Sequence, residues 1–555
     1  MYDYLIVGAG IAGLYTAYKI NEHYPTKKIC IIEATSYIGG RLHSIKYDGI
    51  IVDGGGARFN TKQYRVVSLV KELGLQTKLI PITNTIKYKS INPKYNINLE
   101  TIFPNIDNFI IYLKKYIKTN NISEKDLINT TILDLVEDTS INTKYPTIKQ
   151  YLIDIYPYYS ELAVLNAYEA INLFTNEFSD KMKYSIINGG MEQLADIIYN
   201  KLKTNDNVKI YKEYPLKNIK KINTNNTNNT NNTYYEIICS NTTTVLTTKN
   251  LIIAIPKNKL LNIEYLTRNT NLLHNINSVQ NEPLYRIYAR YPLDKQTGKV
   301  WFDGMEKIST NLPIKYILPI NSKKGVIMIS YTDSKFANYW TKKLSEGTFE
   351  NTLNKQLKLL FPDINIPKAK WYKHCPWVSG AGYWKSGYNR KTILTQMIQP
   401  IENENLFICG ENYSSHQAWV EGSLETSQLV LSKLGINIKN KVTKVTKVTN
   451  TKRKKILSGS GSINNKTNKT NKTKKTNKTK EYTLDEVAKH NKKTDAWIVI
   501  NNKVANITSW IPKHPGGDII MKGVGKDATS LFNNIGHDNY AKKMVKKYQI
   551  GVLKK

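Results

Sequence analysis

The chain has 555 residues, which is room for two or three domains with cores of their own. Its formal net charge of +36 would suit nucleic acid, but outside residues 441–480 the excess is scattered, and no basic helical stretch with interleaved aromatic residues occurs. We therefore expect no nucleic-acid partner, and we attribute much of the charge to the Lys, Asn, Ile and Tyr content that an AT-rich genome produces.

The composition also bears on the compartment. No apolar run reaches the roughly 18 residues that a bilayer span needs, so we expect no transmembrane anchor. The four cysteines are scattered and never form Cys-x-x-Cys, which argues against a disulfide framework. We expect a cytoplasmic protein, or one carried in a virion if the source is a virus.

The N-terminal residues have the pattern of a βαβ unit that binds a dinucleotide. An apolar run at 2–7 is followed by Gly8, Gly10 and Gly13 and then by a helical stretch to about residue 24. Gly8 permits a tight turn, Gly10 lets the backbone approach a pyrophosphate, and Gly13 lets helix and strand pack closely. The free N–H groups of the helix N-terminus would face the phosphates.

The next segment favours FAD over NAD. A second apolar run at 28–32 ends at Glu33, which is placed to accept hydrogen bonds from a ribose and disfavours a 2′-phosphate. Gly40 and Arg41 follow directly, and there the glycine permits a close approach while Arg41 can reach the pyrophosphate.

The remaining elements follow in chain order. Residues 61–180 are mostly helical in pattern, and 283–335 alternate like antiparallel strands. The Asn/Thr tract at 222–233 lies between two strand-like segments, so we expect an expanded hairpin loop. Residues 405–435 repeat the order of strand, Gly-rich turn and helix, so both ends of the first domain supply parts of the dinucleotide site.

An ordered set of short segments resembles the flavin amine oxidase family, which includes monoamine oxidases, polyamine oxidases and L-amino acid oxidases. The segments are 39–41, 54–59, 188–191, 253–256, 380–383, 407–411 and 419–422. The resemblance covers about residues 1–435. It implies an α/β fold in which an FAD-binding Rossmann-like domain of the amine oxidase type is interleaved with an α+β substrate domain.

The resemblance also implies roles around the flavin. Gly410 would lie in the cofactor site, and Glu411 would bind the ribityl and phosphate region, with a helix-cap carboxylate as the alternative. The helix that starts near Val420 would direct its N-terminus at the N1–C2 edge of the flavin and stabilise the reduced form.

Substrate-site residues follow from the same resemblance. Arg58 matches the arginine with which L-amino acid oxidases pair the substrate carboxylate, although a structural ion pair is the alternative. Trp419 and Tyr383 would be the two aromatic side chains that flank the substrate, with Trp384 in reserve for Tyr383. Ordinary core packing is the alternative for Trp419 and Tyr383.

Two positions depart from the family pattern. Gly382 stands where some monoamine oxidases have the cysteine that attaches the flavin, so we expect non-covalent FAD. Arg286 is the nearest counterpart of a lysine that assists reaction with oxygen at flavin N5. An arginine stays charged and cannot act as a base near neutral pH, so rapid reaction with oxygen is in doubt.

The last 75 residues resemble cytochrome b5 over the whole segment. His514 opens a His-Pro-Gly-Gly sequence and His537 lies in Gly-His-Asp. The resemblance implies a small α+β domain in which both imidazoles ligate one haem b, a site without an open position that favours electron transfer. Leu531 and Phe532 are either haem-wall residues or simple core residues.

These observations predict three parts: an amine oxidase-like domain at 1–440, a basic flexible linker at 441–480, and a b5-like domain at 481–555. We expect an FAD-dependent enzyme that oxidises an amine or L-amino acid to an imine and passes the electrons to O2 or to the fused haem. An external redox partner is a further candidate electron acceptor or donor. The alternatives are a flavin desaturase or porphyrinogen-type oxidase, and a non-catalytic flavin- and haem-binding protein of a virion.

Overall fold

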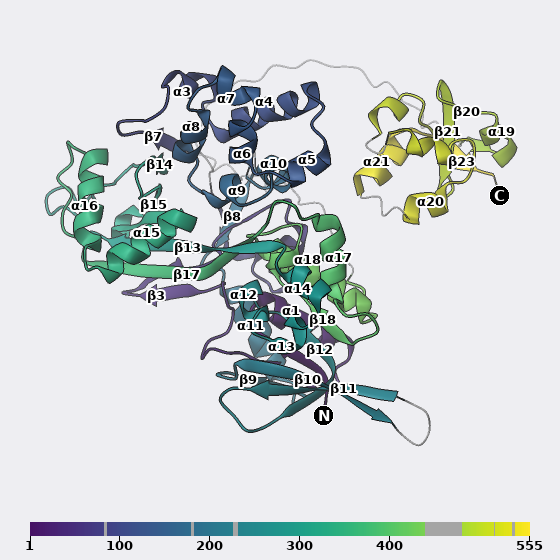
Figure 1. Cartoon of the computed structure of the whole chain (residues 1–555), viewed down its shortest axis with the longest axis horizontal. Coiled ribbons are helices and arrows are strands. Elements are labelled where there is room, and N and C mark those ends of the chain that lie inside the picture. The colour runs from purple at the N-terminus through teal and green to yellow at the C-terminus, as the bar shows by residue number, and fades with distance from the viewer. Residues whose placement is uncertain are drawn as a thin grey trace, which may run out of the picture. The chain divides into compact units, whose positions relative to one another are not determined.

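The computed structural model describes residues 1–82, 86–178, 182–225, 231–438, 480–514, 517–534 and 539–554. It divides the chain into two compact units, Met1–Thr446 and Lys447–Lys555 (Figure 1). Of the predicted linker at 441–480, all but Lys480 lies outside the described residues.

A mainly parallel, seven-stranded sheet carries the dinucleotide motif. Its order is β10-β11-β12-β1-β2-β9, and β18 pairs with the end of β12 that β11 leaves free. The strands are β1 (Tyr2–Val7), β2 (Ile29–Ile32), β9 (Val208–Tyr211), β10 (Leu216–Asn225), β11 (Asn231–Cys239), β12 (Leu246–Ile253) and β18 (Leu406–Ile408). The parallel register sets Val7 beside Ile32 and Ile253, and Ile253 beside Ile408, so four carboxyl ends meet at one edge.

Three helices pack beside this sheet and bury its apolar side chains: α1 (Ile11–His23), α11 (Gln193–Lys203) and α18 (Val420–Lys433). Helix α1 contacts both of the others, although about 400 residues separate it from α18 in the sequence. The first and last segments of the domain therefore lie together, as the repeated strand, turn and helix pattern predicts.

The Asn/Thr tract at 222–233 is less of a loop than expected. Strands β10 and β11 run antiparallel into the tract, where Asn223 pairs with Thr233 and Asn225 pairs with Asn231. The prediction of a hairpin is confirmed, but the expectation that the whole tract forms its loop is wrong. The backbone ladder continues through polar residues because backbone N–H and C=O groups, and not side chains, form the pairing.

The substrate half is built around a second sheet of order β17-β13-β16-β15-β14-β7. Its strands are β7 (Lys87–Lys89), β13 (Val279–Arg290), β14 (Ile308–Thr310), β15 (Tyr316–Asn321), β16 (Val326–Asp333) and β17 (Trp371–Trp384). Helices α15 (Ser334–Ser345) and α16 (Phe349–Leu360) cover one end of it, around the buried Trp340 (Figure 1). The alternating pattern at 283–335 therefore does form antiparallel strands.

Helices fill most of residues 61–180, as predicted. They are α2 (Tyr64–Glu72), α3 (Asn98–Ile102), α4 (Ile106–Thr119), α5 (Glu124–Ile128), α6 (Ile132–Glu137), α7 (Ser140–Lys144), α8 (Ile148–Ile155), α9 (Ser160–Ala163) and α10 (Ala167–Asn176). Small sheets join them to the rest: β3 (Ser44–Tyr47) with β4 (Ile50–Asp53), and β5 (Phe59–Asn60) with β8 (Tyr184–Ile187) and β6 (Leu79–Ile82). Further short helices are η1 (Gln76–Lys78), α12 (Lys257–Leu260), α13 (Glu264–Thr267), α14 (Thr270–Ile276), η2 (Ser322–Lys324), α17 (Arg390–Ile398) and η3 (Glu411–Tyr413).

The C-terminal unit has a five-stranded sheet of order β19-β23-β22-β21-β20 and its own apolar cores. Its strands are β19 (Glu481–Tyr482), β20 (Asn491–Lys492), β21 (Asp495–Ile500), β22 (Lys503–Asn506) and β23 (Gln549–Leu553). Its helices are α19 (Leu484–Ala488), η4 (Ile511–Lys513), η5 (Gly517–Gly523), α20 (Thr529–Asn534) and α21 (Asn539–Lys547).

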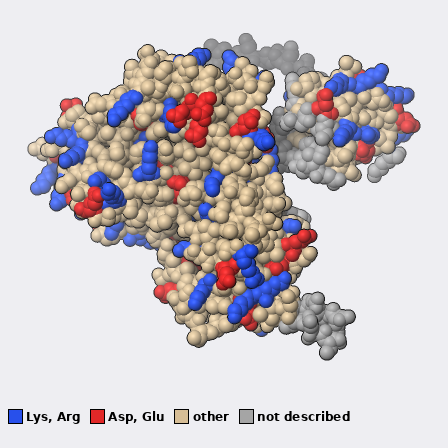
Figure 2. All heavy atoms as spheres, in the orientation of Figure 1, with Lys and Arg blue, Asp and Glu red and all other residues tan. Residues whose placement is uncertain are grey.

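The surface shows how the positive charge is arranged. On the face drawn in Figure 2, the described Lys and Arg side chains form small separate groups among uncharged residues. No helix in the described part of the chain is both long and apolar enough to cross a membrane.

Candidate active site and haem ligands

A cavity of about 750 Å³ opens at the edge where the parallel strands β1, β2, β12 and β18 end. This is the place where α/β sheets bind dinucleotides. The cavity brings together eleven of the residues that the sequence singles out: Gly8, Gly10, Glu33, Gly40, Arg41, Arg58, Arg286, Tyr383, Gly410, Glu411 and Trp419. Gly13 does not line it and lies within α1.

The glycine turn has the shape that a pyrophosphate requires. Gly8 has a φ of +102°, and a Cβ there would lie 2.6 Å from the Ala254 carbonyl oxygen. A Cβ on Gly13 would lie 2.0 Å from the Gly8 carbonyl oxygen, so helix and strand can pack only if residue 13 is glycine. Gly10 faces open space and caps α1 without a side chain, which leaves the helix N–H groups directed at the cavity.

Glu33 is fixed before any ligand binds. One of its carboxylate oxygens accepts a hydrogen bond from the Ala9 backbone N–H at 2.8 Å, and the other accepts from the Thr35 backbone N–H and hydroxyl at 2.9 Å. The carboxylate therefore ties the glycine turn to the end of β2. Glu33 lines the cavity, which is consistent with the predicted hydrogen bond to a ribose.

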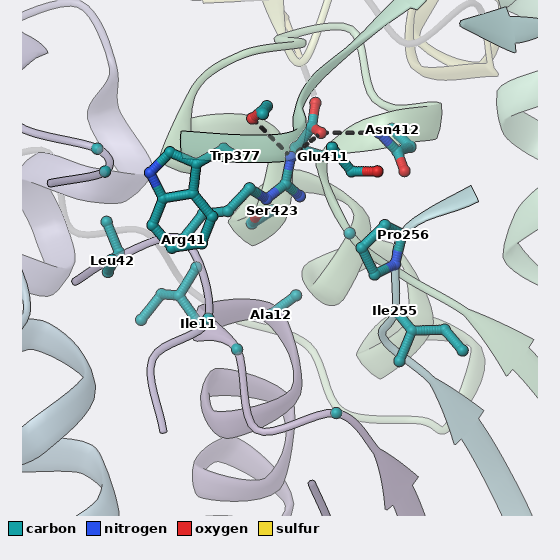
Figure 3. Close-up of a pocket in the computed structure, with 18 of the residues that line it drawn as sticks. Ile11, Ala12, Arg41, Leu42, Ile255, Pro256, Trp377, Glu411, Asn412 and Ser423 are labelled. Atoms are coloured by element: carbon teal, nitrogen blue, oxygen red, sulfur yellow. Dashed lines mark hydrogen bonds and ion pairs between the residues drawn. The ribbon is translucent and has the colours of Figure 1, made fainter. Parts of the chain in front are cut away.

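Arg41 and Glu411 form an ion pair across the cavity. Figure 3 shows Arg41 extending beside Trp377 toward Glu411. The same guanidinium donates to the Gly380 carbonyl at 3.1 Å. Glu411 also accepts from Asn412 and from the Ala418 backbone N–H. This carboxylate is thus largely engaged by protein donors, and its role toward the ribityl chain stays a prediction.

A packing constraint at Gly382 supports non-covalent binding. A Cβ at this position would lie 2.2 Å from the Asn412 side-chain nitrogen and 3.2 Å from the Asn412 Cα. Asn412 is itself fixed, because its side chain donates to Glu411 and accepts from the Lys257 backbone N–H. The structure therefore has no room for a cysteine at 382 unless the neighbouring loop moves.

The N-terminus of α18 adjoins the same cavity. Trp419 caps the helix without a side-chain hydrogen bond, and Val420 and Ser423 of the first turn line the cavity. Ala418, just before, has a φ of +64°, which is unusual for a residue other than glycine. The hydrogen bond from the Ala418 N–H to Glu411 holds this strained backbone in place, and with it the ring of Trp419.

Arg58 lies among aromatic rings. Its guanidinium carbon is 4.7 Å from the centre of the Tyr184 ring and 6.0 Å from that of Trp419. Burial lowers the pKa of Arg58, but nearby tyrosine hydroxyls such as those of Tyr158 and Tyr316 raise it above its ordinary value. The side chain thus stays cationic.

Tyr383 and Trp384 have different surroundings. Tyr383 is buried, lines the cavity and donates from its hydroxyl to Glu161 at 3.3 Å. Trp384 does not line this cavity, and its indole N–H donates to the Ser414 carbonyl at 2.9 Å. The structure therefore places the preferred aromatic residue, and not its reserve, in the cavity.

Arg286 reaches the cavity but is held by the protein. Its Nη1 donates to the Asp53 carbonyl at 2.8 Å, and its guanidinium lies 4.4 Å from the centre of the Tyr331 ring. Neighbouring Tyr331 and Tyr288 outweigh the effect of burial and raise its pKa further above the ordinary arginine value. The expectation that this residue is no base is consistent with these contacts, while its correspondence to the family lysine stays a prediction.

Sequence reasoning missed Glu161, Tyr158 and Tyr331, which also line the cavity. Glu161 is a lone carboxylate in the otherwise apolar and aromatic stretch that follows Ile155. That isolation was the available signal, because a charged residue within such a stretch must be paired or used. The two tyrosines carry no local signal, since Tyr is abundant throughout this chain.

The haem site is described in part. His514 lies just after η4, whereas His537 lies outside the described residues. Phe532 packs on the apolar core of this unit, and Leu531 on the same helix is 44% exposed.

Two protein families match the chain. The flavin containing amine oxidoreductase family matches residues 11–430, and the cytochrome b5-like heme/steroid binding domain matches residues 483–554. The chain therefore belongs to the flavin containing amine oxidoreductases and carries a b5-like domain at its C-terminal end. It is an FAD-dependent oxidoreductase whose two cofactors are FAD and haem, as the sequence predicts.

Relatives match either most of the chain or the haem domain alone. An uncharacterised protein of Acanthamoeba polyphaga mimivirus is 22% identical over 493 residues, which cover 78% of this chain and 93% of the relative. Cytochrome b5 of Oryza sativa subsp. japonica is 47% identical over 73 residues, or 13% of this chain and 53% of that protein.

Solved structures share the fold of the N-terminal unit. A putrescine oxidase variant superposes with a TM-score of 0.60 at 15% identity, and a putative protoporphyrinogen oxidase from Exiguobacterium with 0.53 at 13%. Each comparison covers 78% of this chain and 98% of the other. At such identities the likeness defines the fold and leaves the substrate open.

The lack of room at Gly382 predicts that the flavin is extractable. Acid precipitation of the purified protein should release FAD into the supernatant and leave a colourless pellet, because no thiol is available at 382 to form a covalent bond. A yellow pellet after washing would contradict this prediction. The Gly382→Cys variant, in which Asn412 blocks the side chain, should still release its FAD.

The b5-like unit predicts low-spin, six-coordinate haem with two histidine ligands. In the full chain, His514→Ala or His537→Ala should each abolish the six-coordinate Soret and α-band spectrum. His490 is a matched control, because its ring stacks on Trp497 at 3.6 Å and pairs with Asp495. A six-coordinate spectrum retained in either ligand variant, or lost in His490→Ala, would refute the assignment.

Proposed function

We propose that the protein oxidises the amine of an L-amino acid or a related primary amine to an imine, which water hydrolyses to a carbonyl compound. The observation that carries the proposal is the presence of Arg58, Tyr383 and Trp419 in the same cavity as the dinucleotide turn. When bound, FAD supplies the hydride acceptor for this chemistry. The structural likeness to putrescine oxidase, one form of which holds putrescine, agrees with an amine as substrate.

The charges near Arg58 favour a substrate with a carboxylate. Burial and the nearby charge of Arg58 lower the pKa of Lys307 to about 8. Arg286 adds a further buried cation on the same cavity. An anionic substrate group would relieve this concentration of positive charge, and a planar guanidinium binds a carboxylate through two parallel hydrogen bonds.

The chain's residues chiefly orient the substrate and exclude water. The aromatic surfaces of Tyr383 and Trp419 present faces on which an aliphatic amine can be held with its nitrogen lone pair directed at the cofactor. The reacting amine must be neutral, and we assign no side chain as its base. Arg286 is a cation whose donor is already engaged by the Asp53 carbonyl, so we assign it a positioning role beside the substrate.

For the electron acceptor, we propose the fused b5-like domain. A tether of about 40 residues raises the effective concentration of the second domain to roughly millimolar. An arginine in place of the lysine that assists reaction with oxygen would make another acceptor useful. Oxygen is the alternative electron acceptor, and anaerobic stopped-flow mixing distinguishes it from the haem.

The carboxylate-binding role of Arg58 predicts a substrate-dependent effect. Arg58→Ala should raise KM for an L-amino acid about ten- to a hundredfold and leave the KM of the matching decarboxylated amine nearly unchanged, since a charge-assisted hydrogen bond is worth about 1.5–3 kcal/mol. Arg58→Lys keeps the positive charge but lacks the planar guanidinium. Its KM for the L-amino acid should lie between that of the unmodified protein and that of Arg58→Ala. Steady-state kinetics on both substrates measures the effect, and equal losses would reassign Arg58 to a structural pair.

The acceptor proposal predicts electron transfer within one chain. In anaerobic stopped-flow mixing with an active substrate, haem reduction should follow flavin bleaching at a rate that does not change with protein concentration. His514→Ala, which lacks the haem ligand, should bleach its flavin at the normal rate. A rate proportional to protein concentration, or a ferric haem that persists through many turnovers, would exclude the intramolecular route.

A further inference from the structure

Glu161 is a buried carboxylate in the cavity with an unused oxygen. It lies in the short helix α9, is 3% exposed and lines the cavity. Its Oε1 accepts the hydroxyl hydrogen of Tyr383 at 3.3 Å, while its Oε2 has no hydrogen-bond partner among the described residues. A buried carboxylate oxygen without a donor is costly, so its presence in a binding cavity indicates a ligand group that supplies one.

The electrostatic surroundings of Glu161 favour a positively charged ligand group. Burial raises the pKa of Glu161 well above its ordinary value, and the buried Asp333 raises it further. Asp333 is itself held by the backbone N–H groups of Tyr159 and Ser160. A cation beside Glu161 would offset both effects, whereas an anion would add a third negative charge.

The neighbouring side chains are suited to an ammonium group. The ring of Tyr383 lines the cavity beside the carboxylate. An ammonium is a hydrogen-bond donor and a cation, so it can satisfy the free Glu161 oxygen and also contact an aromatic face.

This ammonium cannot be the nitrogen that reacts. The reacting amine must be neutral, and a carboxylate beside it would hold it protonated. We propose that Glu161 binds a second, cationic nitrogen at the far end of the substrate, so that the preferred substrates are basic L-amino acids or aliphatic diamines. The inference rests on the proposed amine oxidation and names its substrate class.

Substrate pairs test the inference on the unmodified holoenzyme. L-lysine is compared with 2-aminoheptanoate, and 1,5-diaminopentane with hexylamine, because in each pair a methyl group replaces the distal ammonium. In anaerobic flavin bleaching at low substrate concentration, the basic member should have a second-order rate constant of reduction about ten- to a hundredfold higher. Equal or better use of the neutral members would overturn the inference and leave the proposed function intact. If no amine bleaches the flavin, the proposed function fails and this inference fails with it.

Variants then separate binding from positioning. Glu161→Gln should remove the preference by raising KM for the basic members alone, with FAD content and thermal unfolding unchanged. Tyr383→Phe deletes the donor to Glu161 but keeps the ring, and it should affect both members of a pair alike. Glu100→Gln is the matched control, because Glu100 also accepts from a tyrosine, Tyr95, away from the cavity. Equal effects of Glu161→Gln on both members would show that Glu161 only positions Tyr383.

Discussion

The buried carboxylate of Glu411 joins segments that are far apart in the sequence. It pairs with Arg41 from the loop after β2, accepts from the Gly382 N–H in β17, and accepts from Ala418 just before α18. Removing a carboxylate from water costs several kcal/mol, which only such a set of donors offsets. Glu411 therefore ties together the loop after β2, strand β17 and the loop before α18, all of which contribute residues to the wall of the cavity.

A separation of charge within the cavity follows from this assembly. Arg58 lines it from the segment between β4 and β5 and Arg286 from β13, whereas Glu161 lines it from α9. Aromatic rings line the space between, so little water screens the two signs of charge. The proposed substrate, with a carboxylate and a distal ammonium, would match both signs of charge, whereas a neutral polycyclic ligand would add no ion pair to either. This is the physical argument for an amine over a porphyrinogen.

The sequence predicted the cofactor half better than the substrate half. Gly8, Gly10 and Gly13 act through their own backbone at a fixed spacing, so one short segment contains the information. The raised pKa of Glu161 depends on its burial and on Asp333, which lies more than 170 residues away in the sequence. No local sequence pattern encodes that the two carboxyl groups lie near each other. The extent of the β10 and β11 pairing was missed for a related reason, because the Asn/Thr tract has a loop composition and its strand partner decides its conformation.

The same division explains how the fold tolerates divergence. Solved relatives keep the fold at 13–15% identity, since backbone turns and parallel pairing depend on few side chains. The substrate cavity, in contrast, takes its walls from α9, β13, β17 and the loop before α18, each of which can change without disturbing the glycine turn. Substrate preference is therefore free to vary while FAD binding is retained, and in our proposal Glu161, rather than the family motif, determines which amine is preferred.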